Sequence, residues 1–220
     1  MAPFDALTHA MTTVATGGFS THDESLGYYG GWKVLWVAII FMIAGALPFS
    51  FFIAVFFARN MPRYDPQIVV FFLIAISACG ILLVADGFQR ANTFTEFSQY
   101  IFNVVSILTT TGYASGNFMD YGGIGATLFF FLIFIGGCAG STSGGIKIYR
   151  LIVLGQLIRT SLQELLYKRG VFLMRYGKQI VDKDVFRSSM VMLCCFFVFL
   201  AIFTVILGAL GADFITALSG

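Results

Sequence analysis

The sequence predicts an all-α polytopic membrane protein built from repeated units of a helix, a short re-entrant helix with a polar loop, and a second helix. Composition is the first observation: 58% of the residues are hydrophobic, 11% are charged, and the mean hydropathy is +0.88. An average soluble domain has about 25% charged residues. Long apolar tracts and an internal repeat are the other observations, and the repeat is expected to be truncated at both ends of the chain.

Four apolar tracts are long enough, or nearly so, to cross a hydrocarbon core, which needs roughly 20 helical residues. They are residues 34–58, 68–88, 124–158 with a break, and 188–210. The four cysteines fall inside these tracts without the spacing of a metal site or a disulfide framework. We therefore interpret the cysteines as small apolar residues.

Charge predicts how the tracts are oriented. Eleven of the 13 lysines and arginines fall at residues 59–63 and 147–187, and basic residues favour cytoplasmic loops. The loops at residues 59–66 and 159–187 are therefore expected in the cytoplasm. The hydroxyl-rich and glycine-rich stretches between the tracts are then expected on the outer side.

An internal repeat organises the chain. A shift of 94 positions places Thr16 on Thr110, and a shift of 92 positions places Tyr29 on Tyr121. A spanning tract follows each copy. The repeated element is therefore a polar loop that leads into a spanning helix.

A short amphipathic segment precedes each polar loop, at residues 4–15 and 94–109. At 1.5 Å per residue such a segment reaches only about 20 Å, which is too short to span. Thr93 and Glu96 have the spacing of a capping box, which predicts that the second segment begins there as a helix. Both segments are expected to be re-entrant.

The repeat divides the chain into three parts. Residues 1–66 hold a polar loop and the second helix of one unit, and residues 67–166 hold a complete unit whose inner helix is broken. Residues 167–220 hold a cytoplasmic linker, the first helix of a third unit and the start of its short helix. The last assignment rests on residues 215–220, which resemble residues 4–10.

The polar loops suit a cation. Non-helical backbone at membrane depth must be buried in protein or line a watery cavity, and a helix that runs inward points the negative end of its dipole toward the membrane centre. Carbonyl oxygens that face one axis can replace the water of a cation, and glycine permits that backbone geometry. The candidate ion-binding residues are Thr16, Gly17, Gly18, Phe19, Thr110, Thr111, Gly112 and Tyr113.

Neutral oxygens are the expected ligands, because no carboxylate lies at residues 12–22 or 106–119. That chemistry favours a monovalent cation over Ca²⁺ or Mg²⁺, which usually require acidic oxygens. A transported ion is expected, without a cofactor. The alternative is that the glycines serve only close packing of helices.

The third apolar tract is expected to break where five glycines fall within residues 136–145. The candidate residues of this loop are Gly136, Gly137, Gly140, Ser141, Thr142, Ser143, Gly144, Gly145 and Lys147. It is expected near mid-membrane beneath the second polar loop, where it could obstruct a pathway. A phosphate-binding loop is not indicated, because Ile146 separates Gly145 from Lys147 and no strand precedes the glycines.

Three motifs carry a resemblance to a known family. They are "TTVATGGFSTHDESLGYY" at residues 12–29, "TTTGYAS" at residues 109–115 and "GGCAGSTSGGIK" at residues 136–147. In this order they are similar to the pore-forming subunit of bacterial Trk-type potassium uptake systems, in the superfamily that also includes Ktr and plant HKT transporters. The resemblance covers the whole chain.

The resemblance implies a potassium-channel-like pore, in which four helix, pore-loop, helix units surround one pathway and residues 1–66 belong to the second unit. It implies that Gly18 and Gly112 are filter glycines and that residues 136–145 are an intramembrane gating loop. It also implies a homodimer and a cytosolic nucleotide-binding regulatory subunit that docks on the basic loops. The implied location is the bacterial inner membrane, where the protein contacts membrane lipid.

Potassium transport through a carbonyl-lined, gated filter is thus the function that the sequence favours. Two alternatives stay open: a sodium-permeable or sodium-coupled relative, and a non-conducting membrane scaffold. An enzyme is not expected, because no carboxylate pair, nucleophile with base or metal cluster has catalytic spacing. Nucleic acid is not expected as a partner.

Overall fold

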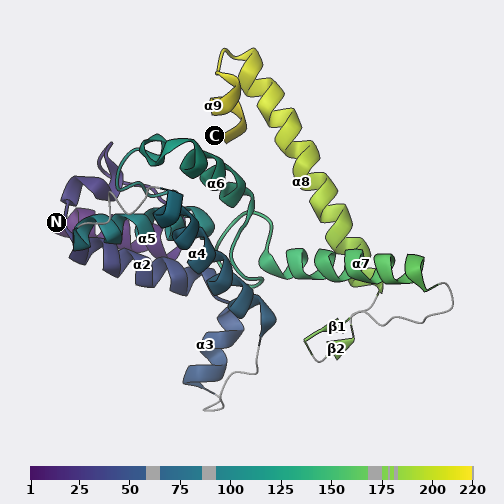
Figure 1. Cartoon of the computed structure of the whole chain (residues 1–220). Coiled ribbons are helices and arrows are strands. Elements are labelled where there is room, and N and C mark those ends of the chain that lie inside the picture. Colours follow the sequence, from purple (N-terminus) through teal and green to yellow (C-terminus); the bar gives the residue numbers. More distant parts are fainter. Residues whose placement is uncertain (58–64, 86–92, 168–174, 178, 181–182, 220) are drawn as a thin grey trace. The chain divides into compact units, whose positions relative to one another are not determined.

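The computed structural model describes all residues except 58–64, 86–92, 168–174, 178, 181–182 and 220. Within this part of the chain the regular secondary structure is helical apart from one two-stranded hairpin and an isolated β-bridge between Ile135 and Ile146. It divides into two compact units, Met1–Ile148 and Tyr149–Gly220 (Figure 1). The predicted all-α class is therefore confirmed.

The first unit holds six α-helices and two 3-10 helices among its described residues. Their bounds are α1 (Pro3–Val14), η1 (Ser25–Tyr29), α2 (Trp32–Ala46), α3 (Phe49–Phe56), α4 (Pro66–Ala85), α5 (Phe94–Leu108), η2 (Phe118–Tyr121) and α6 (Gly122–Phe134). From the boundary onward the elements are α7 (Ile148–Leu166), β1 (Arg175–Tyr176), β2 (Gln179–Ile180), α8 (Lys183–Ala209) and α9 (Phe214–Ser219).

The helices α1 and α5 are the two short segments that precede the polar loops. They contain 12 and 15 residues, so neither could cross a bilayer. The backbone N–H of Thr93 donates a hydrogen bond to Glu96 Oε2 at 3.0 Å, which confirms the predicted capping box at the start of α5. Protein surrounds the C-terminal half of α5, where Phe102 and Leu108 are fully buried.

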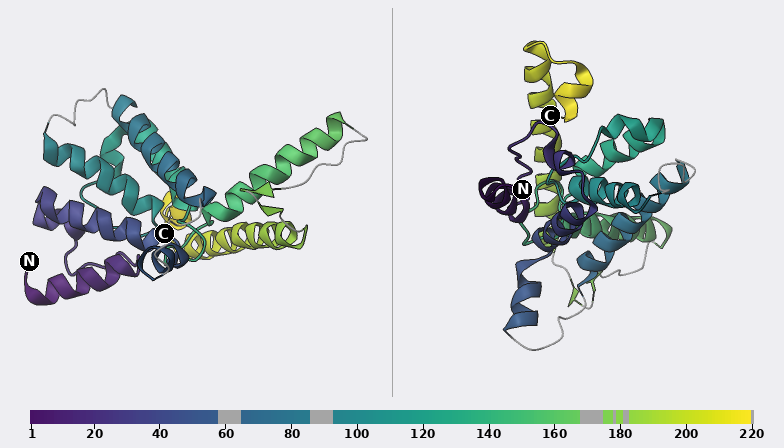
Figure 2. Two further views of the ribbon diagram at one scale, coloured as in Figure 1. Left: turned by 90° about the horizontal axis from the view of Figure 1, so that it is seen from below. Right: turned by 90° about the vertical axis from the view of Figure 1, so that its left-hand side faces the viewer.

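The core of the first unit lies between α2 and α5, and Figure 2 shows these two helices with α1 beside α2. Apolar side chains of the two helices form one buried cluster with residues of η1 and of the second polar loop. Its buried members are Leu26, Leu35, Ala38, Ile39, Met42, Phe102, Val105 and Tyr113. Because lipid tails are as apolar as these side chains, close packing rather than escape from water stabilises such an interface in a membrane.

The first apolar tract is broken, although the sequence predicts one span at residues 34–58. The helix α2 ends at Ala46, α3 begins at Phe49, and the two axes differ by 98°. Proline explains the position of the break, because Pro48 has no backbone N–H and its ring clashes with the carbonyl four residues earlier.

Two described helices, Pro66–Ala85 and Asp184–Ala209, are long and apolar enough to cross a membrane, and the bent pair α2–α3 would make a third span if it counts as one. The third tract is divided as expected, since α6 ends at Phe134 and α7 begins at Ile148. Much of the two loops that are predicted to be cytoplasmic lies outside the described residues.

Candidate cation site

Two loop segments follow α1 and α5 with the same backbone conformation: residues 16–19, the first segment, and residues 110–113, the second segment. Their first residues, Thr16 and Thr110, have φ angles of 50° and 57°. Their third residues, Gly18 and Gly112, have φ angles of 67° and 82°. A positive φ is rare for a β-branched residue and costs about 1–3 kcal/mol, so the surroundings must hold both segments in this form.

The helix that precedes each segment holds it with equivalent backbone hydrogen bonds. The N–H of Gly17 donates to the carbonyl of Thr12 at 2.7 Å, and the N–H of Thr111 donates to the carbonyl of Ser106 at 2.9 Å. These pairs are related by the same shift of 94 positions. The partly negative C-terminal ends of α1 and α5 therefore both meet the loop segments.

Side-chain hydroxyls of the same two helix residues bond the far ends of the segments. The Thr12 hydroxyl donates to the carbonyl oxygen of Phe19 at 3.0 Å. The Ser106 hydroxyl donates to the carbonyl oxygen of Tyr113 at 2.7 Å. The repeat seen in the sequence is thus a repeat of hydrogen bonds as well.

The two segments lie against each other. A Cβ atom added at Gly18 would stand 1.7 Å from the carbonyl oxygen of Thr111, so a glycine is needed there for space as well as for its φ angle. Just beyond the segments, the N–H of Gly27 donates to the carbonyl of Ala114 at 3.1 Å. The candidate residues of the two copies therefore form one site.

The aromatic residues that end the two segments differ in their surroundings. Tyr113 is fully buried, and its phenol oxygen lies 2.5 Å from Thr12 Oγ1 and 3.1 Å from Thr13 Oγ1. Phe19 has no hydroxyl, and its side chain is 76% exposed. Tyr113 thereby joins the second segment to the helix of the first.

Polar residues at equivalent places on α1 and α5 support the chain after each segment. His9 Nδ1 lies 2.6 Å from the carbonyl oxygen of Asp5, and His9 Nε2 lies 2.9 Å from Ser20 Oγ. Asn103 Oδ1 accepts a hydrogen bond from the N–H of Ser115 at 3.2 Å. His9 and Asn103 are again 94 positions apart; the sequence analysis did not identify Asn103, although the repeat could have indicated it.

An acidic side chain lies in the first turn of α1. The Thr21 hydroxyl donates to Asp5 Oδ1 at 2.9 Å, and this bond is the main reason why the pKa of the Asp5 carboxyl is lowered. Burial opposes this effect by raising the pKa of Asp5, and His22 Nε2, 3.9 Å from Asp5 Oδ2, lowers it by a smaller amount than burial raises it.

The glycine loop, residues 136–147, contacts the first residue of both segments. The N–H of Gly144 donates to Thr110 Oγ1 at 2.6 Å, and the Thr16 hydroxyl donates to Thr142 Oγ1 at 3.3 Å. The sequence predicts this loop beneath the second segment alone. Its hydrogen bonds place it at the first residue of the first segment as well.

Internal contacts make the glycine loop compact. Lys147 Nζ donates to the carbonyl oxygen of Ser143, and the Ser143 hydroxyl oxygen accepts a hydrogen bond from the N–H of Gly137 at 2.9 Å. A Cβ atom added at Gly136 would stand 1.9 Å from the carbonyl oxygen of Gly144. Glycine is therefore needed at position 136 because the two strands of the loop cross closely.

The break between α2 and α3 receives the glycine loop. Backbone groups left unpaired by the break bond the loop instead, which satisfies the end of α2 and the start of α3. The N–H to carbonyl pairs are Cys138 to Ala46 (2.9 Å), Thr142 to Gly45 (3.1 Å) and Phe49 to Gly140 (2.9 Å).

Gln67, at the start of α4, is a further residue that the sequence analysis missed. Its Oε1 accepts a hydrogen bond from the N–H of Ala139 at 2.8 Å, and its Nε2 donates to Asp65 Oδ2 at 2.7 Å. The side chain is only 6% exposed. A single polar residue beside an apolar tract has no spacing that would have revealed this contact.

The oxygens of the site are neutral. Among the described residues, no group of three or more histidine, cysteine, aspartate or glutamate side chains is placed to hold a metal ion. The segments offer carbonyl and threonine hydroxyl oxygens, which suit a weakly hydrated monovalent cation.

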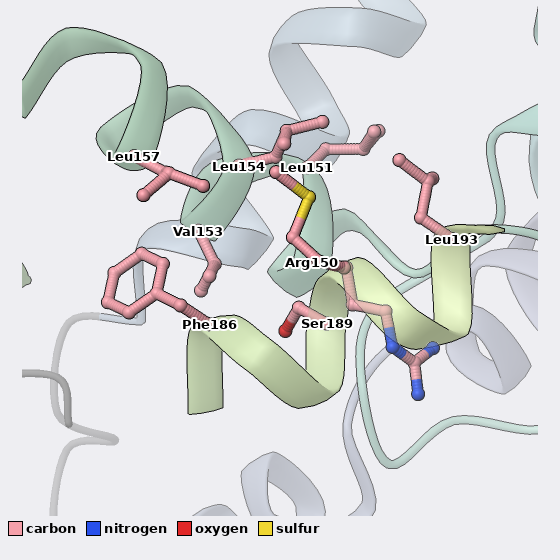
Figure 3. Close-up of a pocket in the computed structure, with 9 residues that line it drawn as sticks. Arg150, Leu151, Val153, Leu154, Leu157, Phe186, Ser189 and Leu193 are labelled. Carbon is pink, nitrogen blue, oxygen red and sulfur yellow. The ribbon is translucent and has the colours of Figure 1, made fainter. Parts of the chain in front are cut away.

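The second unit has a small apolar pocket between α7 and α8 (Figure 3). Val153 and Leu157 of α7 face Phe186 of α8 across it, and Ser189 lies at its edge. Polar groups do not converge there, and none of the predicted site residues lines it.

Comparisons with known proteins agree with the arrangement of the first unit. The family model described as "TrkH: Cation transport protein" matches residues 2–219. A Trk system potassium uptake protein, TrkI of Halomonas elongata, is 41% identical over 225 residues, which cover 100% of this chain and 45% of the relative. TrkG of Escherichia coli is 31% identical over 224 residues, which cover 99% of this chain and 45% of the relative.

A solved structure has the same fold. The crystal structure of the potassium transporter TrkH from Vibrio parahaemolyticus matches with a TM-score of 0.90 and 31% sequence identity, over 100% of this chain and 48% of that chain. The chain thus spans about half the length of the relatives that it matches. Because the family model matches nearly the whole chain and the described helices include some that could cross a membrane, the protein is a multi-pass membrane protein and belongs to the TrkH family of cation transport proteins.

Proposed function

We propose that this chain forms part of a potassium pathway in which the two loop segments are filter segments and residues 136–147 are the gating loop. The observation that carries the proposal is the adjacency of two loops of one conformation, with the glycine loop bonded to the first residue of each. In this proposal α1 and α5 are pore helices.

The proposed ion ligands are the backbone carbonyls of the filter segments, aided by threonine hydroxyls. The oxygens are neutral, and the pore helices direct their negative ends toward them. The named relatives are potassium uptake proteins, which favours potassium over sodium as the transported ion.

The glycine loop is the proposed gate because it is bonded to both filter segments at their inner ends. Its backbone N–H and carbonyl groups are hydrogen-bonded to the backbone of the α2–α3 break and to the side chain of Gln67. Lys147 holds the loop from within. Ions would pass only when the contacts to Thr16 and Thr110 are released.

The filter assignment is tested with Gly112→Ala in the full-length transporter that carries this chain. A side chain at φ 82° costs about 1–2 kcal/mol, which distorts the carbonyls. We expect rubidium uptake to fall in a potassium-requiring strain, and unchanged uptake by folded protein would refute the assignment. The alternatives are tested with the unsubstituted transporter. Greater uptake of sodium than of rubidium by this protein would favour the sodium-permeable alternative, whereas the scaffold alternative predicts that it takes up neither ion.

The gate assignment is tested by removing residues 141–143, which include Thr142; its hydroxyl bonds Thr16 of the first filter segment and the carbonyl of Val14 at the end of α1. We expect higher basal rubidium flux without the regulatory partner. A variant that remains fully regulated would contradict the role of the loop.

We further propose a homodimer in the bacterial inner membrane, with a cytosolic nucleotide-binding regulatory subunit. The support for the cytosolic regulatory subunit is the basic character of residues 159–187, which include Arg175 at the hairpin and Arg187 on α8. Reversing the charge of these two arginines should weaken co-purification of the regulator. Unchanged co-purification would argue against docking on this surface.

A further inference from the structure

The hydroxyl of Ser106 is used differently from most hydroxyls in the helices of this protein. Serine and threonine in helices usually donate to the carbonyl one turn back, as Ser98 does to Phe94 and Ser77 does to Ile74. Ser106 instead donates at 2.7 Å to the carbonyl oxygen of Tyr113, the last residue of the second filter segment. The side chain is fully buried, so water does not compete for this bond.

The first copy makes the same contact. Thr12, 94 positions before Ser106, has its hydroxyl oxygen 3.0 Å from the carbonyl oxygen of Phe19 and also 3.0 Å from the carbonyl oxygen of Thr8, one turn back, so that it donates to one of the two at a time. Its oxygen also lies 2.5 Å from the phenol oxygen of Tyr113. Because a hydroxyl has one proton, Tyr113 donates to Thr12 when Thr12 donates to Phe19, whereas the phenol donates to the carbonyl oxygen of His9, at 3.2 Å, when Thr12 donates to it. The first of these two arrangements links the filter segments. A chain of hydrogen bonds then runs from one filter segment to the other.

Tyr113 is held at both ends by this chain. Its carbonyl is bonded by its own pore helix, through Ser106, and its phenol is bonded by the neighbouring pore helix, through Thr12. The phenol also lies 3.1 Å from Thr13 Oγ1. The spacing between the two filter segments at their outer ends therefore depends on these hydroxyls.

The bonds also determine which carbonyls are available to an ion. A carbonyl oxygen that accepts a hydrogen bond from the pore helix directs electron density toward that helix. The carbonyls of Phe19 and Tyr113 are engaged in this way, which leaves the first three carbonyls of each segment as the better cation ligands. The fourth carbonyl then anchors the outer end of the filter.

We propose that Ser106 and Thr12, with the Tyr113 phenol, are positioning residues that set ion selectivity, an inference that rests on the proposed potassium pathway. They act through the filter carbonyls, whose separation they hold. Loss of one bond lets the outer carbonyls turn and approach a smaller ion. The expected effect is a fall in the preference for rubidium over sodium with only a small change in rubidium uptake.

The test compares Ser106→Ala with Ser77→Ala in the full-length transporter. Both variants lose one serine hydroxyl from a helix, but Ser77 bonds only its own helix, according to the described contacts. Uptake of rubidium and of sodium is measured per folded transporter in liposomes. We expect the rubidium to sodium ratio to fall about 2- to 12-fold in Ser106→Ala, the range that one ordinary hydrogen bond is worth, and to stay unchanged in Ser77→Ala.

Two further variants separate positioning from folding. Ser106→Thr keeps the hydroxyl, as Thr12 does in the first copy, and should restore the ratio. Tyr113→Phe removes only the phenol oxygen and should lower the ratio, which decides the matter if Ser106→Ala does not fold. A normal ratio of rubidium to sodium uptake in folded Ser106→Ala overturns this inference. If Ser106→Ala does not fold, a normal ratio in Tyr113→Phe overturns it. If the unsubstituted transporter takes up neither ion, the proposed pathway itself fails.

Discussion

The close approach of the two proposed filter segments makes Gly18→Ala the most informative substitution. Its φ of 67° costs an alanine about 1–2 kcal/mol. The new Cβ would also stand 1.7 Å from the carbonyl oxygen of Thr111, whereas real Cβ contacts are essentially never shorter than 3.0 Å. The two segments would have to separate by about 1.3 Å, the difference between these distances.

A separation of that size is large for an ion site. Oxygen distances to Mg²⁺ and Ca²⁺ differ by only about 0.3–0.5 Å, and proteins distinguish these ions. A strain of about 1–2 kcal/mol corresponds to a factor of about 5–30 in an equilibrium constant, here the one between the native and a relaxed conformation of the first segment. Displacement of the Thr111 carbonyl adds to this effect. We therefore expect Gly18→Ala to reduce rubidium uptake per folded transporter by at least about tenfold.

Gly30→Ala is the matched control. Gly30 has a φ of 57° and no described atom within 4 Å of an added Cβ, so this variant bears the backbone strain without the collision. Uptake is measured in a potassium-requiring strain, with the amount of folded protein determined by size-exclusion chromatography. The reasoning is refuted if Gly18→Ala and Gly30→Ala transport rubidium equally well.

Three further predictions concern the gate and the outer loop. Gly136→Ala should disrupt the glycine loop and raise basal rubidium flux, because its Cβ would stand 1.9 Å from the carbonyl oxygen of Gly144. Gly144→Ala should leave the flux unchanged, because its Cβ would lie at an ordinary contact distance of 3.4 Å from Thr110 Oγ1. Equal fluxes in the two variants would count against the packing argument. Gln67→Leu leaves a loop N–H without its acceptor, which costs about 1–3 kcal/mol, so basal flux should rise, and a basal flux equal to that of the unsubstituted transporter would contradict this role of Gln67. Thr21→Val should raise the pKa of Asp5 toward 3.8, because the Thr21 bond is the main cause of its lowering. In the unsubstituted protein the stability that Asp5 contributes is present above pH 3.8 and is lost as pH falls through the lowered pKa of Asp5. An NMR titration of Asp5 that is the same in both proteins would contradict the role of Thr21.

Glycine and hydroxyl spacing predicted the broken helix and the repeated loop segments because these signals are local. A break in the helix at residues 136–145 follows from the low helix propensity of five glycines. The repeated segments were visible because Thr16 and Gly18 recur as Thr110 and Gly112 with the same positive φ angles. The capping box at Thr93 likewise depends only on residues within one turn.

Contacts between distant parts of the chain were not predictable in the same way. Gln67 meets Ala139 across 72 positions, and the Thr12 hydroxyl meets Tyr113 across 101 positions. Neither pair has a spacing that marks it, because the packing of whole apolar helices decides which side chains meet. The bend at Pro48 also needed the structure, since apolar composition alone predicts one continuous span.

The sequence by itself determined the membrane setting, the repeat, the two filter-like segments and the broken helix, because composition and short-range backbone preference specify them. Only the tertiary structure decided that Gly18 faces Thr111, that the α2–α3 break receives the glycine loop, and that Ser106 bonds the carbonyl of Tyr113. The physical reason is that these features depend on which helices pack together. Nearly uniform apolar helices carry little information about their neighbours in their own sequences.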